Sequence, residues 1–190
     1  MRADYRHLSL SGLASEFEAM ALDADAAFGR LNERRLNWRP EATRWSVGQC
    51  FDHLLSSNEQ MFRSMDAAMD SSHRPTLWQR LPILPRAFGR MLIASQGPDA
   101  TRKFTAPRQA QPSSSAIDAE IMQRFVASQH EAASRMRALD GRDVARIMVS
   151  PFASVVTYSV LDGCRIVVAH QRRHFEQARR VMQAPGFPVT

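Results

Sequence analysis

The chain has 190 residues, of which 44% are hydrophobic and 23% charged; this balance is typical of a globular protein with a buried core and excludes global disorder. The length fits a single domain over residues 1–190. No apolar run approaches the roughly 20 residues that span a bilayer, and residues 1–10 carry charges where a signal peptide has an apolar core. We therefore expect neither membrane insertion nor export.

The net charge of +6 comes almost wholly from arginine, since Lys103 is the only lysine. The arginines are scattered, no aromatic residues are interleaved with them, and no nucleic-acid motif is present, so we do not expect nucleic-acid binding. Cys50 and Cys164 have neither C-x-x-C spacing nor a disulfide framework, which is expected in a reducing compartment. These features predict a cytoplasmic protein.

The first predicted helix begins near Leu10. Its apolar residues recur at steps of three and four, which places them on one face: Leu10, Leu13, Phe17, Met20, Ala24, Ala27, Phe28 and Leu31. Trp38 and Pro40 end this pattern.

A second helix is predicted over residues 46–70. Ser46 and Gln49 have the spacing of a capping box, in which the serine oxygen and the glutamine side chain satisfy free backbone amides at the helix start. An apolar stripe follows, made of Val47, Cys50, Phe51, Leu54, Asn58, Met61, Phe62 and Met65. Ser71, Ser72 and Pro75 end the periodicity.

Residues 71–112 are predicted to form a long crossover, because six prolines forbid a long continuous helix there. Residues 86–94 have the pattern of a short helix within it, and residues 96–112 have the composition of an exposed loop.

The third and fourth helices follow the crossover. Ser115 and Asp118 resemble a capping box at the start of the third helix, whose stripe is Ile117, Ile121, Phe125, Ser128, Ala132, Met136 and Leu139. After a connection over residues 142–156, Ser159 and Asp162 open a fourth helix that runs to about Gln183. No convincing strand pattern is present. The prediction is an all-α four-helix bundle with a long crossover between the second and third helices.

His170 and His174 are four residues apart, so their rings project from one side of the fourth helix, one turn apart. Such a pair chelates Zn, Ni, Fe or Mn when one or two further ligands are present, but alone it is a weak signal. His53 lies off the centre of its helix's apolar stripe and could face either a seam between helices or the solvent. Gln177 is either a hydrogen-bond partner near His174 or a polar residue at the bundle edge.

Other polar residues suggest no further site. Asp52 points to a different side of the helix from His53, so a Ser-His-Asp triad is unsupported. His130 is expected to be exposed, and the two cysteines are expected to pack in the core. The arginines of the fourth helix are expected to form a solvated face: Arg172, Arg173, Arg179 and Arg180.

Two segments carry a family resemblance. Residues 45–54, with the sequence WSVGQCFDHL, resemble the second-helix signature of the DinB-like superfamily, in which a Trp-Ser opening precedes a His-Leu pair. Residues 170–177, with the sequence HQRRHFEQ, resemble its C-terminal signature, and residues 103–107 resemble its crossover loop. The resemblance extends from about residue 10 to residue 183.

The resemblance implies that His53, His170 and His174 bind a divalent metal, with zinc or nickel the first expectation, iron or manganese the next, and water in the open positions. The family includes proteins assigned as metal-dependent hydrolases and thiol S-transferases that join bacillithiol, mycothiol or glutathione to electrophiles. It therefore implies a metal-dependent transferase or hydrolase acting on a small molecule, with a low-molecular-weight thiol in the transferase case, and commonly a homodimer. The alternative is a noncatalytic helical bundle that binds a small ligand or a partner.

Overall fold

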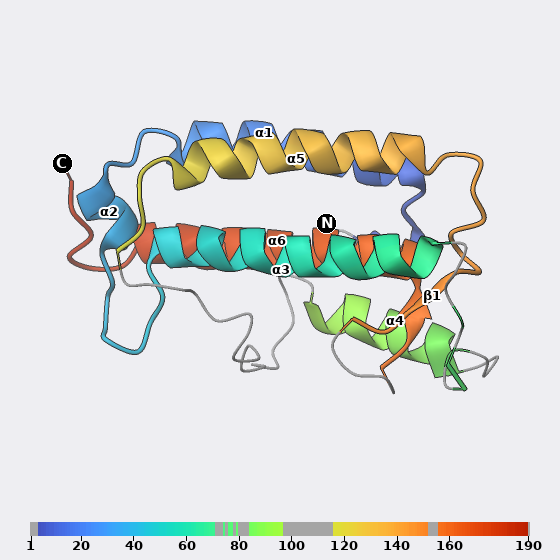
Figure 1. Ribbon diagram of the computed structural model, residues 1–190. Helices are drawn as coiled ribbons and strands as arrows, with labels where there is room; N and C mark the ends of the chain where they lie inside the picture. Colours follow the sequence, from blue (N-terminus) through green and yellow to red (C-terminus); the bar gives the residue numbers. More distant parts are fainter. Residues whose placement is uncertain are drawn as a thin grey trace.

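The computed structural model describes residues 4–70, 74, 76–77, 79, 84–96, 116–151 and 156–189. Four long helices pack in two layers: α1 (Leu10–Phe28) lies beside α5 (Ile121–Ala138), and α3 (Val47–Met69) lies beside α6 (Val160–Met182) (Figure 1). Within each layer the two helices run antiparallel (Figure 1). The predicted all-α four-helix bundle is confirmed.

Serine side chains cap three of the long helices. Ser46 and Gln49 form the predicted capping box of α3, with both bonds at 3.1 Å. Ser159 Oγ accepts from the backbone N–H of Asp162 at 3.0 Å, which opens α6 as predicted. Ser9 caps α1 in the same way. These bonds satisfy amides that would otherwise have no partner in the first turn.

The start of α5 differs from the prediction. The helix begins at Ile121, and its N-cap residue Glu120 makes no side-chain capping bond. Instead, Asp118 Oδ1 accepts from the backbone N–H of Glu120 at 2.7 Å, in a local turn that precedes the helix. Ser115, the other half of the predicted capping box, lies outside the described residues. The loop predicted over 96–112 also lies outside them, except for Gln96, which ends a helix.

Several short elements connect the long helices. α1 ends at Phe28, before Leu31, and is followed by the unpredicted short helix α2 (Glu33–Asn37). Residues Tyr5–His7 form a 3-10 turn, and β1 (Met148–Val149) pairs antiparallel with β2 (Tyr158–Ser159). These elements are only two to five residues long, so they leave little periodic pattern in the sequence.

The crossover contributes α4 (Leu84–Gln96), which is longer at both ends than the predicted helix over 86–94. α4 packs against α6 through Gly89, where an added Cβ would lie 2.7 Å from Asp162 Oδ2. The absence of a side chain at Gly89 thus allows close approach, and Ile93, one turn further, is buried. The crossover helix is in this way held against the helix that carries His170 and His174.

The apolar core has two clusters. One cluster contains an aromatic group of Phe28, Phe51, Phe125 and Phe175, with neighbouring ring centroids 4.8 to 6.2 Å apart. Edge-to-face aromatic pairs of this kind contribute about 0.5 to 1.5 kcal/mol beyond the area they bury. The other cluster, around Phe17, Met65 and Tyr158, fills the opposite end of the bundle. Cys50 and Cys164 are fully buried in these clusters, as predicted, and burial raises the pKa of each thiol to about 12.

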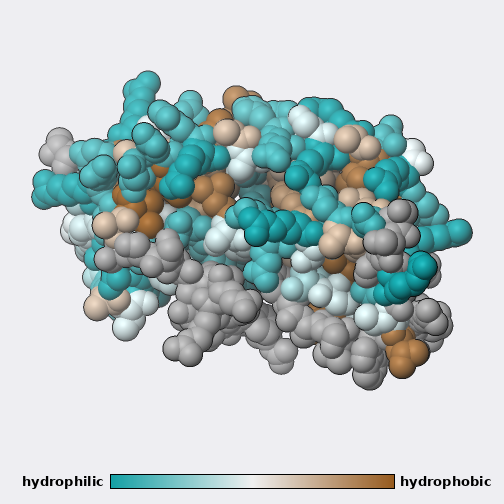
Figure 2. Space-filling view, in the orientation of Figure 1, coloured by the Kyte–Doolittle hydropathy of each residue, from teal (hydrophilic) through white to brown (hydrophobic). Residues whose placement is uncertain are grey.

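The expectation that Arg172 lies on a solvated face is wrong. Its guanidinium donates to Glu16 at 2.9 Å and to Asp23 at 2.6 Å, and so ties α6 to α1. The sequence pattern could not indicate this, because the partners are about 150 positions away on a helix that happens to pack alongside. The face in Figure 2 is largely hydrophilic, and none of the described helices is long and apolar enough to cross a membrane.

Candidate metal centre

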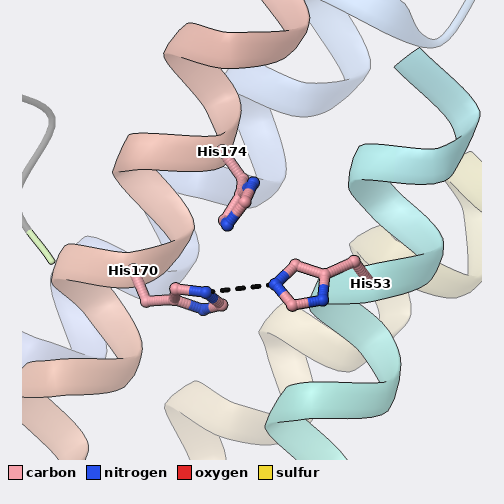
Figure 3. Close-up of side chains that lie close together, drawn as sticks. All are labelled: His53, His170 and His174. Carbon is pink, nitrogen blue, oxygen red and sulfur yellow. Dashed lines mark hydrogen bonds between the residues drawn. The ribbon is translucent and has the colours of Figure 1, made fainter. Parts of the chain in front are cut away.

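Three histidines meet in the seam between α3 and α6 (Figure 3). His53 Nε2 lies 3.2 Å from His170 Nε2, and one ring nitrogen of His174 points toward the space beside them. One ligand atom from each residue lies within 4.8 Å of the other two. The ring centroids are 4.6 to 5.0 Å apart.

Two helices position these rings. His170 and His174 project from successive turns of α6, as their spacing predicted. His53 comes from the second turn of α3. The sequence left two orientations open for His53, and in the structure it faces the seam between the helices. His53 is only 3% exposed, and His174 is 9% exposed. The structure thus brings the three predicted ligands together, whereas exposed His130 pairs with Glu18 on a different face.

Trp45 forms one wall of this cluster. Its ring stacks on His174 with a centroid separation of 5.6 Å and an interplanar angle of 19°, and its centroid is 4.9 Å from that of His53. In sequence, Trp45 was noted only as part of a signature, because nothing in helical periodicity places the residue before an N-cap against another helix. The indole, itself partly buried, lies against both imidazole rings.

Ser57 lies behind His53. Its hydroxyl donates to the backbone carbonyl of His53, and its Oγ lies 3.4 Å from His53 Nδ1. A histidine that binds metal through Nε2 usually makes an outer hydrogen bond through Nδ1, which fixes the ring orientation. Ser57 occupies the place of that outer partner.

Burial keeps the α6 histidines neutral. It lowers the pKa of His170 to about 3 and that of His174 to about 2, and the neighbouring histidines and the Arg173 cation contribute further in the same direction. Neutral imidazoles have the free lone pairs that a metal ion needs. Arg173 is held beside them by a bond from Nη1 to the backbone carbonyl of Ser95 in α4, at 2.9 Å.

The predicted partner Gln177 lies near His174 and weakly raises its pKa by hydrogen bonding. His174 Nδ1 itself is buried and has no hydrogen-bond partner among the described residues. A role for Gln177 in orienting His174 stays a prediction.

The arrangement fits a divalent transition metal. Zn–N bonds of about 2.0 to 2.1 Å at tetrahedral angles separate two ligand nitrogens by about 3.3 Å; His53 Nε2 and His170 Nε2 are 3.2 Å apart. Among the described residues, this is the cluster of three histidine, cysteine or acidic side chains with ligand spacing. Imidazole ligands suit Zn, Ni or Fe, and three of them would leave at least one coordination position for a further ligand.

The sequence profile of the DinB superfamily matches residues 16–178, a range that includes all three histidines. The chain belongs to the DinB superfamily. The match extends from α1 into α6, so it covers both segments that carry the resemblance in sequence. No curated protein and no solved structure matches the chain significantly. DinB membership and the histidine cluster together support a site that could hold a metal ion.

Proposed function

We propose that this DinB protein is a metal-dependent enzyme that acts on a small molecule, as a thiol S-transferase or a hydrolase. The observation that carries the proposal is the convergence of His53, His170 and His174, three neutral nitrogen ligands with no described carboxylate among them. Because neutral ligands leave a divalent ion its full charge, the bound ion would lower the pKa of a water or thiol in its open position.

The protein side of this chemistry is positioning. His170 and His174 would hold the metal from one rigid helix and His53 from a second, and Ser57 lies beside His53 Nδ1, where it would orient that ring. Preorganised ligands of this kind lose little entropy when the metal binds. Trp45 limits water around two of the three rings, which favours attack by a chosen nucleophile over side reactions.

Charge near the site favours an anionic reactant. Arg173 lies close enough to lower the pKa of both α6 histidines, and its guanidinium is partly buried. A desolvated cation attracts a thiolate or carboxylate more strongly than an exposed one does. Low-molecular-weight thiols that carry carboxylates are therefore suitable co-substrates in the transferase case.

Turnover assays test this proposal. Protein loaded with Zn²⁺ or Ni²⁺ is incubated with a thiol such as glutathione and an electrophile such as an aryl halide, and the conjugate is measured by mass spectrometry. A parallel set of ester and amide substrates tests hydrolysis. We expect one set to turn over with the wild type and with His130→Gln, a control outside the cluster, but not with His170→Gln. Absence of turnover in both sets, with metal bound, would overturn the enzyme proposal.

The second candidate is a noncatalytic bundle in which the metal is structural. The low exposure of His53 and His174 and the stacking of Trp45 favour it, because structural metal sites are closed. In that case a chelator would lower the melting temperature strongly, and no substrate would be converted. The homodimer and the cytoplasmic location stay predictions; light scattering would give the oligomeric state.

A further inference from the structure

The apolar core is interrupted halfway along the bundle. Each long helix contributes to one cluster near one end and to the other cluster near its opposite end. Between them lie polar residues that are nevertheless buried: Gln129 of α5 and Gln171 of α6 are 0% exposed, and Asn58 of α3 is 6% exposed. Buried amides at the centre of a helical core require hydrogen-bond partners there.

Helix geometry places Gln129 and Gln171 at the same level along the bundle. Phe125 of α5 and Phe175 of α6 have ring centroids 6.2 Å apart, and these two helices run antiparallel (Figure 1). Gln129 lies one helical turn from Phe125, and Gln171 lies one turn from Phe175, both toward the middle of the bundle. The two glutamines therefore share the next cross-section of the bundle.

The hydrogen bonds of these two glutamines are incomplete. Gln129 Nε2 donates to Ser128 Oγ at 3.0 Å, but Gln129 Oε1 is buried and has no partner in the described part of the chain. Gln171 has no partner at either Oε1 or Nε2 among the described residues. The layer thus contains two unpaired acceptors and one unpaired donor group. Leaving all three unpaired in an apolar core would destabilise the fold.

We propose that the middle of the bundle is a binding site for an internal water molecule, held between Gln129 and Gln171. The water donates its two hydrogens to the two Oε1 atoms and accepts one from Gln171 Nε2. Three hydrogen bonds are typical of a buried water. A direct amide pair could also satisfy these atoms, because each Nε2 has two N–H groups. The structure does not form that pair: neither Gln171 Nε2 nor Gln171 Oε1 has a hydrogen-bond partner among the described residues.

This water site lies behind the metal centre and is separate from the proposed activity. Gln171 follows His170 directly and precedes His174 by one turn, and it points into the core while the histidines face the seam. The water would thus fix the rotation of the α6 segment that carries two of the three histidines.

The test on the wild-type protein is a crystal structure at a resolution that shows ordered water, together with NMR cross-peaks between bound water and the side-chain amide of Gln171. We expect a density peak within hydrogen-bond distance of both glutamines and a cross-peak to the Gln171 amide. A direct bond between the two amides, or an empty site with no cross-peak, would overturn the proposal. Neither measurement depends on the metal or on turnover.

Variants provide a second test. Gln129→Leu and Gln171→Leu are compared with Gln123→Leu, an exposed position on the same helix as Gln129. Each core variant removes partners of the water and is expected to lower the melting temperature by about 2 to 12 °C, whereas the control stays near the wild type. The double core variant should lose the water and fall by less than the sum of the two single shifts. Core variants as stable as the control, with the water still present, would contradict the assignment.

Discussion

Acid should destabilise the metal-free protein through His170 and His174. In the folded state, burial lowers their pKa values to about 3 and about 2, below the usual value of about 6.5. Between those limits the unfolded chain binds more protons than the folded chain. Stability is therefore full above pH 6.5 and falls as the pH decreases toward the folded pKa values.

The size of the effect follows from these shifts. At pH 5 both histidines are protonated in the unfolded chain and still neutral in the folded one. Each then costs at most about 2 kcal/mol relative to pH 8, so the pair costs at most about 4 kcal/mol. This is a large part of the roughly 5 to 15 kcal/mol that stabilises an ordinary domain.

The assay is urea unfolding of chelator-treated protein at intervals from pH 8 to pH 5. The lower limit stays above the ordinary pKa values of aspartate and glutamate side chains. Hydrogen bonds from Arg137 and His130 lower the pKa of Glu18 further. The double variant His170→Gln/His174→Gln lacks both groups and should lose most of the slope. A wild type whose stability is flat from pH 6.5 to pH 5, or a slope equal in the double variant, would refute the reasoning.

Three further changes test packing and the site. Gly48→Ala would place the new Cβ 2.9 Å from Ile117 Cβ. The overpacking should cost about 1 to 3 kcal/mol, more than the helix-propensity gain of about 1 kcal/mol, so the melting temperature should fall. A higher melting temperature would contradict this close packing. Tryptophan fluorescence should fall when Ni²⁺ is added to the wild type, because Trp45 stacks on His174, and should change little in Trp45→Phe; equal quenching in both would place the metal elsewhere. Arg172→Ala removes two ion pairs to α1. By chemical unfolding, it should lower the free energy of unfolding by about 1 to 2 kcal/mol at low salt and by less at about 1 M salt. A loss that does not depend on salt would indicate that Arg172 acts through packing instead.

The fold could be predicted because each long helix carries its own local signals. Apolar residues at steps of three and four mark its buried face, and serines at positions 46 and 159 mark the start of two of the four. The short helix α2 (Glu33–Asn37) and the two-residue strands β1 and β2 could not be predicted, since elements this short have no periodic pattern. Their conformation is set by packing against the long helices.

The site was partly predictable. The spacing of His170 and His174 indicated a shared side, but helical periodicity leaves the partner helix undefined, so His53 entered through resemblance. The contacts of Trp45 depend on how α3 and α6 pack, which no local pattern specifies. On α5, the predicted apolar stripe included Ser128, whereas the neighbouring Gln129 is the fully buried residue. The position of Gln129 beside this stripe could have indicated a buried polar residue.

The most direct test of the metal centre is the metal content of tag-free protein, measured by elemental mass spectrometry. The account predicts about one divalent transition-metal ion per chain in the wild type and in His130→Gln, and its loss in both His53→Gln and His170→Gln. Circular dichroism confirms that each variant is folded. A wild type without metal under metal-replete conditions, or metal retained in both variants of the cluster, would contradict the assignment of these histidines as ligands.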